Sequence, residues 1–168
     1  GAVDFNVAQQ NGVEIATKDI LSLSFADGAQ NRLVFVDGAY SGKHSSTANL
    51  PAGTRVQSLA EVLRQNDELI APWFARRAEF HDRSFVALNT AFMEDGAVVF
   101  IPRGCRLEAP IHVLYLSTRA AKPVAFHPRN LIVCGEESEI KIVESYVGVG
   151  EGVYFANPVT EIAGAPGS

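Results

Sequence analysis

Hydrophobic and polar residues follow different spacings in three zones of the chain. Residues 1–56 mix short strand-like runs with many turn residues, and residues 57–96 repeat apolar positions at helical spacing. Residues 97–168 change to short β runs that are separated by glycine and proline. The pattern predicts an α+β protein with a mixed and helical amino-terminal region, 1–96, followed by a β region, 97–168.

The first zone contains two strand and turn signals. Residues 32–36 are rich in β-branched and aromatic side chains and stop at Asp37-Gly38, which predicts a strand and a tight turn. Residues 13–15 follow Asn11-Gly12, another strong turn dipeptide, and form a second short strand-like run.

The second zone begins with two apolar stripes. The first stripe begins directly after Ser58, which is its predicted N-cap. Glu61 follows Ser58 by three residues, and the two together form a capping box. The second stripe covers residues 69–74, where Pro72 marks the start or a kink of a helix. Trp73 in this stripe is expected to be a core residue.

A third stripe, residues 85–93, closes the helical zone. Its apolar residues recur at i, i+3, i+7 and i+8, which predicts an amphipathic helix. Asp82 or Ser84 is the expected cap at its start, and Gly96 is the expected residue at its end.

Glycines recur between the short β runs of the third zone. The runs are residues 98–101, 111–116, 131–133 and 140–143. Gly104, Gly135 and Gly164 follow one another at nearly equal intervals of about 30 residues, a period typical of stacked solenoid coils. A β-sandwich built from hairpins is the competing architecture on this pattern.

Composition narrows the classes of function. The chain has 168 residues, is 47% hydrophobic and has a net charge of −5. This acidic balance argues against general binding to nucleic acids or anionic membranes, because phosphate affinity needs clustered lysine and arginine. No apolar run is long enough to predict a transmembrane helix. The two cysteines are too few for a disulfide framework and indicate a reducing compartment, here the cytoplasm.

Each candidate metal ligand has a simpler structural explanation. Cys105 and Cys134 lack a Cys-x-x-Cys partner, and a four-ligand site needs more soft donors than lie near them. His112 lies within an apolar run and is expected to be satisfied locally. His127 precedes Pro128 at a predicted bend. The sequence therefore predicts structural roles for all four side chains.

Two further motifs do not support catalysis. Residues 38–44 have one residue too few between the glycines for a phosphate-binding loop, and His44 replaces the required hydroxyl residue. Residues 136–139 contain three glutamates that are best explained as a solvated bend. Glu144 and Glu161 lie in predicted strands whose relative register the sequence leaves open.

Several ordered blocks resemble a known protein family. The blocks are residues 32–38, 85–92, 100–104, 109–112, 127–132, 143–148 and 154–162. Together they are similar to the SufB/SufD family of iron–sulfur cluster assembly proteins, and to the SufD branch more than to the SufB branch. The resemblance covers about residues 30–162. It implies a largely helical amino-terminal region followed by the first coils of a right-handed parallel β-helix.

The resemblance also implies a function. In this family SufB, the SufC ATPase and SufD form a complex that assembles iron–sulfur clusters, with SufD as a non-catalytic scaffold. It implies SufB-like and SufC-like partners and a complex that handles a cluster and ATP, and it leaves a flavin in that complex open. The family's cluster and partner residues lie in a carboxy-terminal part. No catalytic, cofactor-binding or metal-binding residue is therefore expected in this chain.

The chain is expected to be an amino-terminal fragment, because members of the family are much longer. A β-helix that stops at Ser168 would expose an uncapped edge, which predicts self-association through that end. Two other functions remain as alternatives. A β-helix carbohydrate-active enzyme would need clustered carboxylates, and a left-handed β-helix acyltransferase would need a six-residue repeat.

Overall fold

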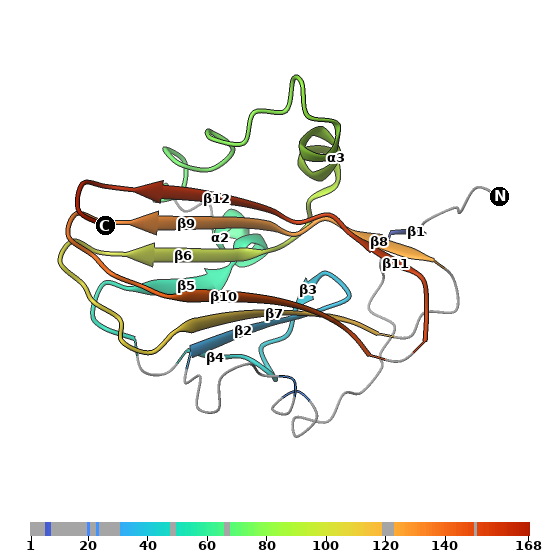
Figure 1. Ribbon diagram of the computed structural model, residues 1–168, viewed down its shortest axis with the longest axis horizontal. Helices are drawn as coiled ribbons and strands as arrows, with labels where there is room; N and C mark the ends of the chain where they lie inside the picture. Colours follow the sequence, from blue (N-terminus) through green and yellow to red (C-terminus); the bar gives the residue numbers. More distant parts are fainter. Residues whose placement is uncertain are drawn as a thin grey trace.

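The computed structural model consists mainly of β-strands, with few helices (Figure 1). The described residues are 6–7, 20, 23, 31–47, 50–65, 68–118, 123–149 and 151–168. The helices are α2 (Leu59–Arg64) and α3 (Ser84–Phe92). The strands are β1 (Asn6–Val7), β2 (Asn31–Val36), β3 (Ala39–Tyr40), β4 (Ser46–Thr47), β5 (Arg55–Ser58), β6 (Ala97–Ile101), β7 (Ile111–Ser117), β8 (Val124–Phe126), β9 (Arg129–Cys134), β10 (Ile142–Gly148), β11 (Tyr154–Ala156) and β12 (Val159–Gly164). The predicted α+β class is confirmed.

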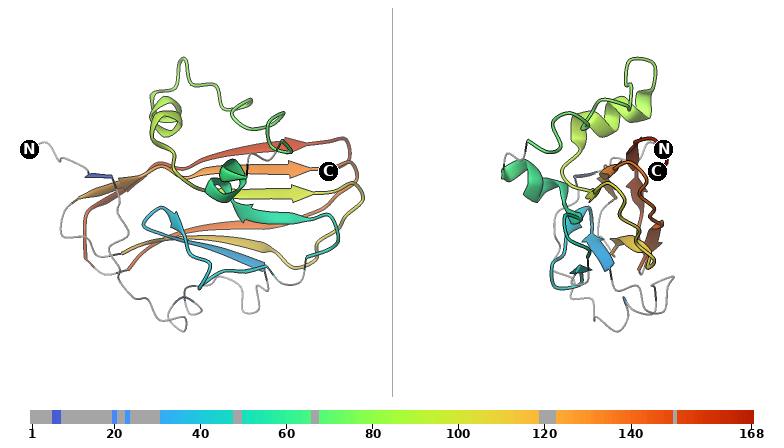
Figure 2. Two further views of the ribbon diagram at one scale, coloured as in Figure 1. Left: turned by 180° about the vertical axis from the view of Figure 1, so that it is seen from behind. Right: turned by 90° about the vertical axis from the view of Figure 1, so that its left-hand side faces the viewer.

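The strands form three sheets, which we name A, B and C. Sheet A has the order β1-β8-β11, sheet B has β10-β7-β2-β3 with β4 also paired to β2, and sheet C has β12-β9-β6-β5. From β6 onward the chain passes through sheets C, B and A in turn and then repeats the circuit (Figures 1 and 2). The pairs formed among β6 to β12 are parallel, unlike the antiparallel hairpins of a sandwich.

Each circuit takes about the same length of chain. Val98 pairs with Leu131 in sheet C, Ile111 pairs with Ile142 in sheet B, and Val124 pairs with Tyr154 in sheet A. In every pair the second residue follows the first by about 30 residues, which is within the range of solenoid repeats. The period that the sequence predicts is therefore the distance along the chain between stacked strands.

The turn that follows β6, β9 and β12 of sheet C repeats with the same geometry. Gly104, Glu137 and Gly167 each have a positive φ, of 68°, 55° and 74°. They occupy the third position of turns 102–105, 135–138 and 165–168, and in each turn the fourth residue donates its N–H to the first carbonyl. The sequence-based alignment of Gly104 with Gly135 and Gly164 was wrong, because Gly135 begins its turn and Gly164 precedes one.

Residues before the predicted boundary at 96 belong to the same sheets as those after it. Strand β2 pairs in parallel with β7, and β5 pairs antiparallel with β6. Between residues 31 and 96 the described helices are α2 and α3, and strands β2 to β5 occupy much of the rest, so this stretch is mixed and not largely helical as the resemblance implied. The division into units at residues 1–96 and 97–168 stays a prediction.

The main hydrophobic core lies between the inner faces of sheets B and C. Alternate residues of a strand point to the same face, and the core takes one set from each strand. The fully buried members include Leu33, Phe35, Val99, Ile101 and Ile111. Two smaller clusters cover the outer faces: Ile20 packs on sheet B, and Leu59, Val62 and Ile70 pack on sheet C. This places both helices on the outer side of sheet C (Figure 2).

The two strongest local predictions are confirmed. β2 ends at Asp37-Gly38, which have φ values of 49° and 85° and form a two-residue hairpin into β3. The Ser58 hydroxyl accepts a hydrogen bond from the Glu61 N–H at 3.3 Å and caps α2. The strand-like run predicted at residues 13–15 lies outside the described residues.

One helix prediction was wrong, and the helix predicted over residues 85–93 is confirmed but has different caps. Residues 69–74 form turns instead of a helix, and their apolar side chains cover sheet C. Helix α3 starts at Ser84 but ends at Phe92, and its N-cap position, Arg83, makes no side-chain capping bond. Gly96 does not end the helix, because it lies against a neighbouring strand, where an added Cβ would be 2.0 Å from the Arg129 carbonyl oxygen.

Candidate functional site

The most buried charged groups of the described chain form an ion pair on the outer face of sheet C. Arg129 begins β9 opposite Val159 of β12, so Glu161, two residues further along β12, lies on the same face as Arg129. The Nη2 and Nε atoms of Arg129 donate to Glu161 Oε1 at 2.7 and 3.0 Å. Both side chains are 1% exposed.

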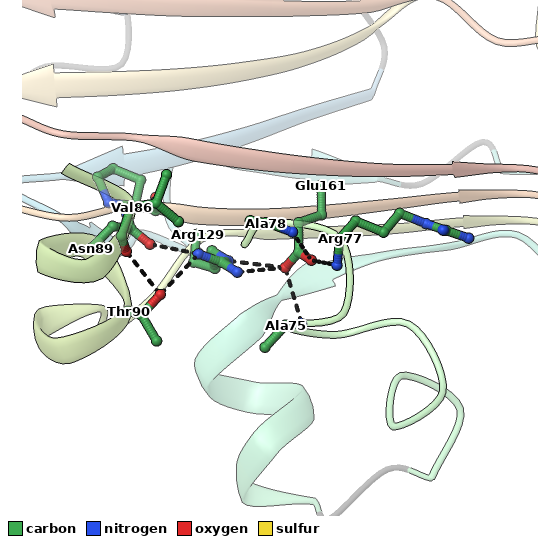
Figure 3. Close-up of polar contacts among 9 residues, drawn as sticks. Ala75, Arg77, Ala78, Val86, Asn89, Thr90, Arg129 and Glu161 are labelled. Atoms are coloured by element: carbon green, nitrogen blue, oxygen red, sulfur yellow. Dashed lines mark hydrogen bonds and ion pairs between the residues drawn. The ribbon is translucent and has the colours of Figure 1, made fainter. Parts of the chain in front are cut away.

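Glu161 also holds a loop against the sheet (Figure 3). Its Oε1 accepts from the Ala75 N–H at 3.0 Å, and its Oε2 accepts from the N–H groups of Arg77 and Ala78 at 2.8 and 3.1 Å. We call residues 75–78 the strap. A carboxylate that accepts five hydrogen bonds fixes the strap far more firmly than apolar packing alone would.

Arg129 reaches in the opposite direction, toward helix α3 (Figure 3). Its Nη1 donates to Asn89 Oδ1 at 3.2 Å and to Thr90 Oγ1 at 3.4 Å. Asn89 in turn donates to the carbonyl oxygens of Pro128 and Asn157, both at 2.8 Å. The ion pair and the asparagine together fasten the strap and α3 to the strands of sheet C.

The ion pair is suited to structure and not to proton transfer. Burial is the largest single influence on Glu161 and acts to raise its pKa. The N–H donors of Arg77 and Ala78 and the charge of Arg129 outweigh it, so the pKa of Glu161 is lowered. The carboxylate therefore stays ionised and its oxygens stay engaged.

A cavity of about 520 Å³ lies next to this network, between α3 and sheet A. We call it the α3 groove. Its lining residues are Asp37, Gly38, Phe85, Leu88, Ala91, Phe92, Met93, Glu94, Asp95, Ala125, Phe126, His127 and Phe155. Its size is typical of small-ligand and peptide sites, and its walls are mainly apolar.

His127 lies among aromatic rings in the groove. Its ring centroid is 5.8 Å from that of Phe92 and 6.0 Å from that of Phe155, and its Nδ1 lies 3.2 Å from Asn157 Nδ2. Burial lowers the pKa of His127, while the nearby charge of Glu94 partly opposes that effect. A neutral ring with Nδ1 as acceptor fits the amide donor of Asn157.

The other sequence candidates lie apart from one another. His112 is buried and its Nε2 lies 2.9 Å from Ser145 Oγ, so the local satisfaction expected for it is confirmed. Cys105 and Cys134 are half-buried free thiols, and burial raises the pKa of Cys134. Within the described residues, no group of three His, Cys, Asp or Glu side chains is arranged to hold a metal ion.

The glutamates and the glycine motif have structural surroundings. Glu136 forms an exposed ion pair with Arg103 at 3.1 Å. Glu144 accepts hydrogen bonds from Thr160 and Tyr146, both at 2.9 Å. It does not face Glu161, which is bound to Arg129. Residues 38–44 belong to the β2–β3 hairpin and the turn after it, so they do not lead into a helix as a phosphate-binding loop does.

Sequence reasoning missed the pairing of Arg129 with Glu161, as well as the role of Asp95. Asp95 Oδ1 accepts from Ser58 Oγ at 2.8 Å, and its Oδ2 accepts from the Tyr40 N–H at 3.0 Å, so one carboxylate joins α2 to β3. A signal for the ion pair was present: opposite charges one circuit plus two residues apart, within apolar runs. The pair can be predicted from this signal only when the length of the circuit between β9 and β12 is known.

The fold and the site define a domain of stacked parallel strands whose buried charges serve structure. Comparison with known proteins identifies the family of the chain. Residues 3–113 match the sequence model of the family described as SufBD protein N-terminal region. The chain therefore belongs to the SufB/SufD family.

Several relatives are similar to the chain over different lengths. An iron–sulfur cluster assembly SufBD family protein of Synechocystis sp. is 32% identical over 96% of this chain and 37% of its own length. Protein ABCI7, chloroplastic, of Arabidopsis thaliana is 39% identical over 46% of this chain and 18% of its own length. Iron–sulfur cluster assembly protein SufB of Bacillus subtilis is 26% identical over 80% of this chain and 29% of its own length. The chain thus spans well under half the length of these relatives.

The described helices show no membrane-spanning segment. None of them is both long and apolar enough to cross a bilayer.

Proposed function

We propose that this chain is a non-catalytic scaffold element of an iron–sulfur cluster assembly complex, of the SufD type. The match of residues 3–113 to the SufBD family carries the proposal. The names of the Synechocystis and Bacillus relatives, which describe cluster assembly proteins, support it. In this proposal the cluster and ATP are handled by the complex, with SufB-like and SufC-like subunits as partners.

The architecture that fits this role is the start of a right-handed parallel β-helix. Two facts support it: the parallel pairs between strands one circuit apart, and the repeated turn after β6, β9 and β12 of sheet C. The right hand follows from the general preference of parallel crossover connections. In the same proposal the chain is the amino-terminal part of a longer protein, since the matched family model describes an N-terminal region and the chain spans 37% of the Synechocystis relative. A cytoplasmic location stays a prediction, because one relative is named as chloroplastic.

Co-purification tests the proposal. The chain, extended by the remainder of a SufD-type relative, is co-expressed with a tagged SufB-type subunit and a SufC-type ATPase. Recovery of all three proteins in one complex, with ATPase activity lost only when the SufC-type subunit is omitted, is the expected result. A chain that fails to join the complex, or that shows ATPase activity by itself, would refute the proposal.

The carbohydrate-active alternative has no observation in its favour. Three glutamates of the β region are engaged with separate partners: Glu161 with Arg129, Glu136 with Arg103, and Glu144 with Thr160. Paired catalytic carboxylates need to flank one open space.

A further inference from the structure

The α3 groove has an apolar rim that the fold does not cover within the described residues. Phe85 and Phe92 are 65% and 54% exposed, although both belong to the apolar stripe of the helix. Leu88 lies between them on the same face and also lines the cavity. An amphipathic helix normally buries such a stripe, so this face of α3 has the character of a contact surface.

The floor of the groove holds the rim in place. The rings of Phe85 and Phe155 are 6.3 Å apart, and those of Phe92 and His127 are 5.8 Å apart. The Phe85 carbonyl accepts from Asn157 Nδ2 at 2.8 Å, which ties the start of α3 to the end of β11. A surface held in this way loses little side-chain freedom when a partner binds.

The charged residues that line the groove are all acidic. Its lining includes three carboxylates, from Asp37, Glu94 and Asp95, and no lysine or arginine. Asp37 and Asp95 are buried and accept hydrogen bonds from the chain itself, whereas Glu94 is exposed at the rim. A partner with basic groups beside its apolar residues complements this arrangement.

We propose that the α3 groove binds the apolar face of a basic amphipathic helix from a protein partner. The two rim phenylalanines lie two helical turns apart, about 10 Å along the axis of α3. Two turns of a docked helix present anchors at i, i+3 or i+4, and i+7 over the same length. The volume of about 520 Å³ accommodates several such side chains. This inference goes beyond the scaffold function, which could hold with the groove empty.

The test uses two matched peptides and the full 168-residue chain. One probe is a dye-labelled peptide of leucine and lysine at amphipathic helical spacing, and the other has glutamate in place of every lysine. Fluorescence anisotropy measures each dissociation constant. The lysine peptide is expected to bind, with helical circular dichroism induced on binding, and the glutamate peptide is expected to bind at least about tenfold more weakly.

Variants locate the binding. Phe92→Ser is expected to weaken binding of the lysine peptide by roughly tenfold, the size of a hot-spot loss, and Glu94→Gln by a smaller factor. Phe80→Ser is the matched control, because Phe80 is 46% exposed and lies outside the groove. Circular dichroism and thermal unfolding verify that each variant folds.

Three outcomes would overturn the proposal. In the first, Phe92→Ser folds and binds as the wild type does. In the second, Phe80→Ser weakens binding as much as Phe92→Ser. In the third, the chain dimerises in sedimentation experiments and Phe92→Ser abolishes the dimer, which would make a second copy the occupant.

Discussion

Replacement of Glu161 by alanine tests whether the buried ion pair holds the strap and α3 on the sheet. The variant removes two hydrogen bonds from Arg129 and three from backbone N–H groups of the strap. It leaves a guanidinium that is 1% exposed without its counter-ion. Loss of one partner of a buried pair typically costs about 3–5 kcal/mol. The strap N–H groups can swing out to water, so we expect the total to stay within that range.

That cost is large beside the whole stability of a small domain, which is about 5–15 kcal/mol. Equilibrium unfolding in urea measures it. Trp73, the single tryptophan of the chain, reports on this region, because it packs against the outer cluster of sheet C and has the Arg77 guanidinium 5.6 Å from its ring. We also expect faster trypsin cleavage at Arg76 and Arg77 once the strap is released.

Glu136→Ala is the matched control. It removes an ion pair whose side chains are 73% and 49% exposed, so the expected cost is below about 1 kcal/mol. The double variant Arg129→Met with Glu161→Met provides a second check, because apolar replacement of both partners avoids a lone buried charge and is expected to recover most of the loss. A cost for Glu161→Ala no larger than that of Glu136→Ala would refute the reasoning.

The pH dependence of the same pair has a definite sign. The pKa of Glu161 is lowered in the folded protein, so the unfolded chain takes up a proton first as the pH falls. The stabilisation is therefore complete above the ordinary pKa of 4.5 and is lost as the pH drops through the lower folded value. In urea unfolding below pH 4.5, the wild type is expected to lose stability more steeply than Glu161→Gln. Parallel slopes would contradict the assignment.

Three further predictions concern other parts of the fold. Gly96→Ala places a Cβ 2.0 Å from the Arg129 carbonyl oxygen and is expected to lower the free energy of unfolding in urea by about 3 kcal/mol. Gly104→Ala, with φ 68° and open space around it, is expected to lower it by about 1 kcal/mol. Equal losses in the two variants would contradict this reasoning. Burial lowers the pKa of His127, so the free energy of unfolding is expected to fall as the pH drops below 6.5. The fall is expected to be less steep in His127→Gln than in the wild type, and identical slopes of stability against pH would count against this prediction. Ile162 faces inward on the last strand yet is 62% exposed, so Ile162→Lys is expected to reduce self-association in sedimentation experiments; an unchanged or wholly monomeric wild type would oppose this.

Local signals in the sequence identified the elements whose geometry depends on near neighbours. The hairpin at Asp37-Gly38 needs only residues that tolerate a positive φ, and the cap at Ser58 needs a hydroxyl before a helical stripe. Both were predictable. The family could also be identified from the sequence, because each of the ordered blocks that carry the resemblance is a local pattern.

The wrong prediction of a helix at residues 69–74 and the wrong prediction of where α3 ends both involve tertiary contacts. Residues 69–74 have helical spacing, but their apolar side chains are satisfied by covering sheet C from a series of turns, with Ile70 buried there. Helix α3 ends at Phe92 because the chain must turn into β6, where Asp95 and Gly96 make side-chain and backbone contacts with strands on either side. Periodicity alone does not carry that information.

The site depended on register, which a single sequence does not fix. Glu161 follows Arg129 by one circuit plus two residues, and the pairing of Arg129 with Val159 sets the length of that circuit. Alignment on the glycines used slightly different intervals and placed the wrong residues side by side. A shift of one residue moves every side chain of a strand to the other face, and would have placed Glu161 inside the β core.

Once the register is known, the outer face of sheet C can be compared with the open edges of the sheets. The ion pair and the strap seal the outer face of sheet C, while β10 and β12 each pair on one side only within the described residues. A contact with another chain is therefore expected at the α3 groove, where Phe85 and Phe92 are exposed, and not across the sealed face.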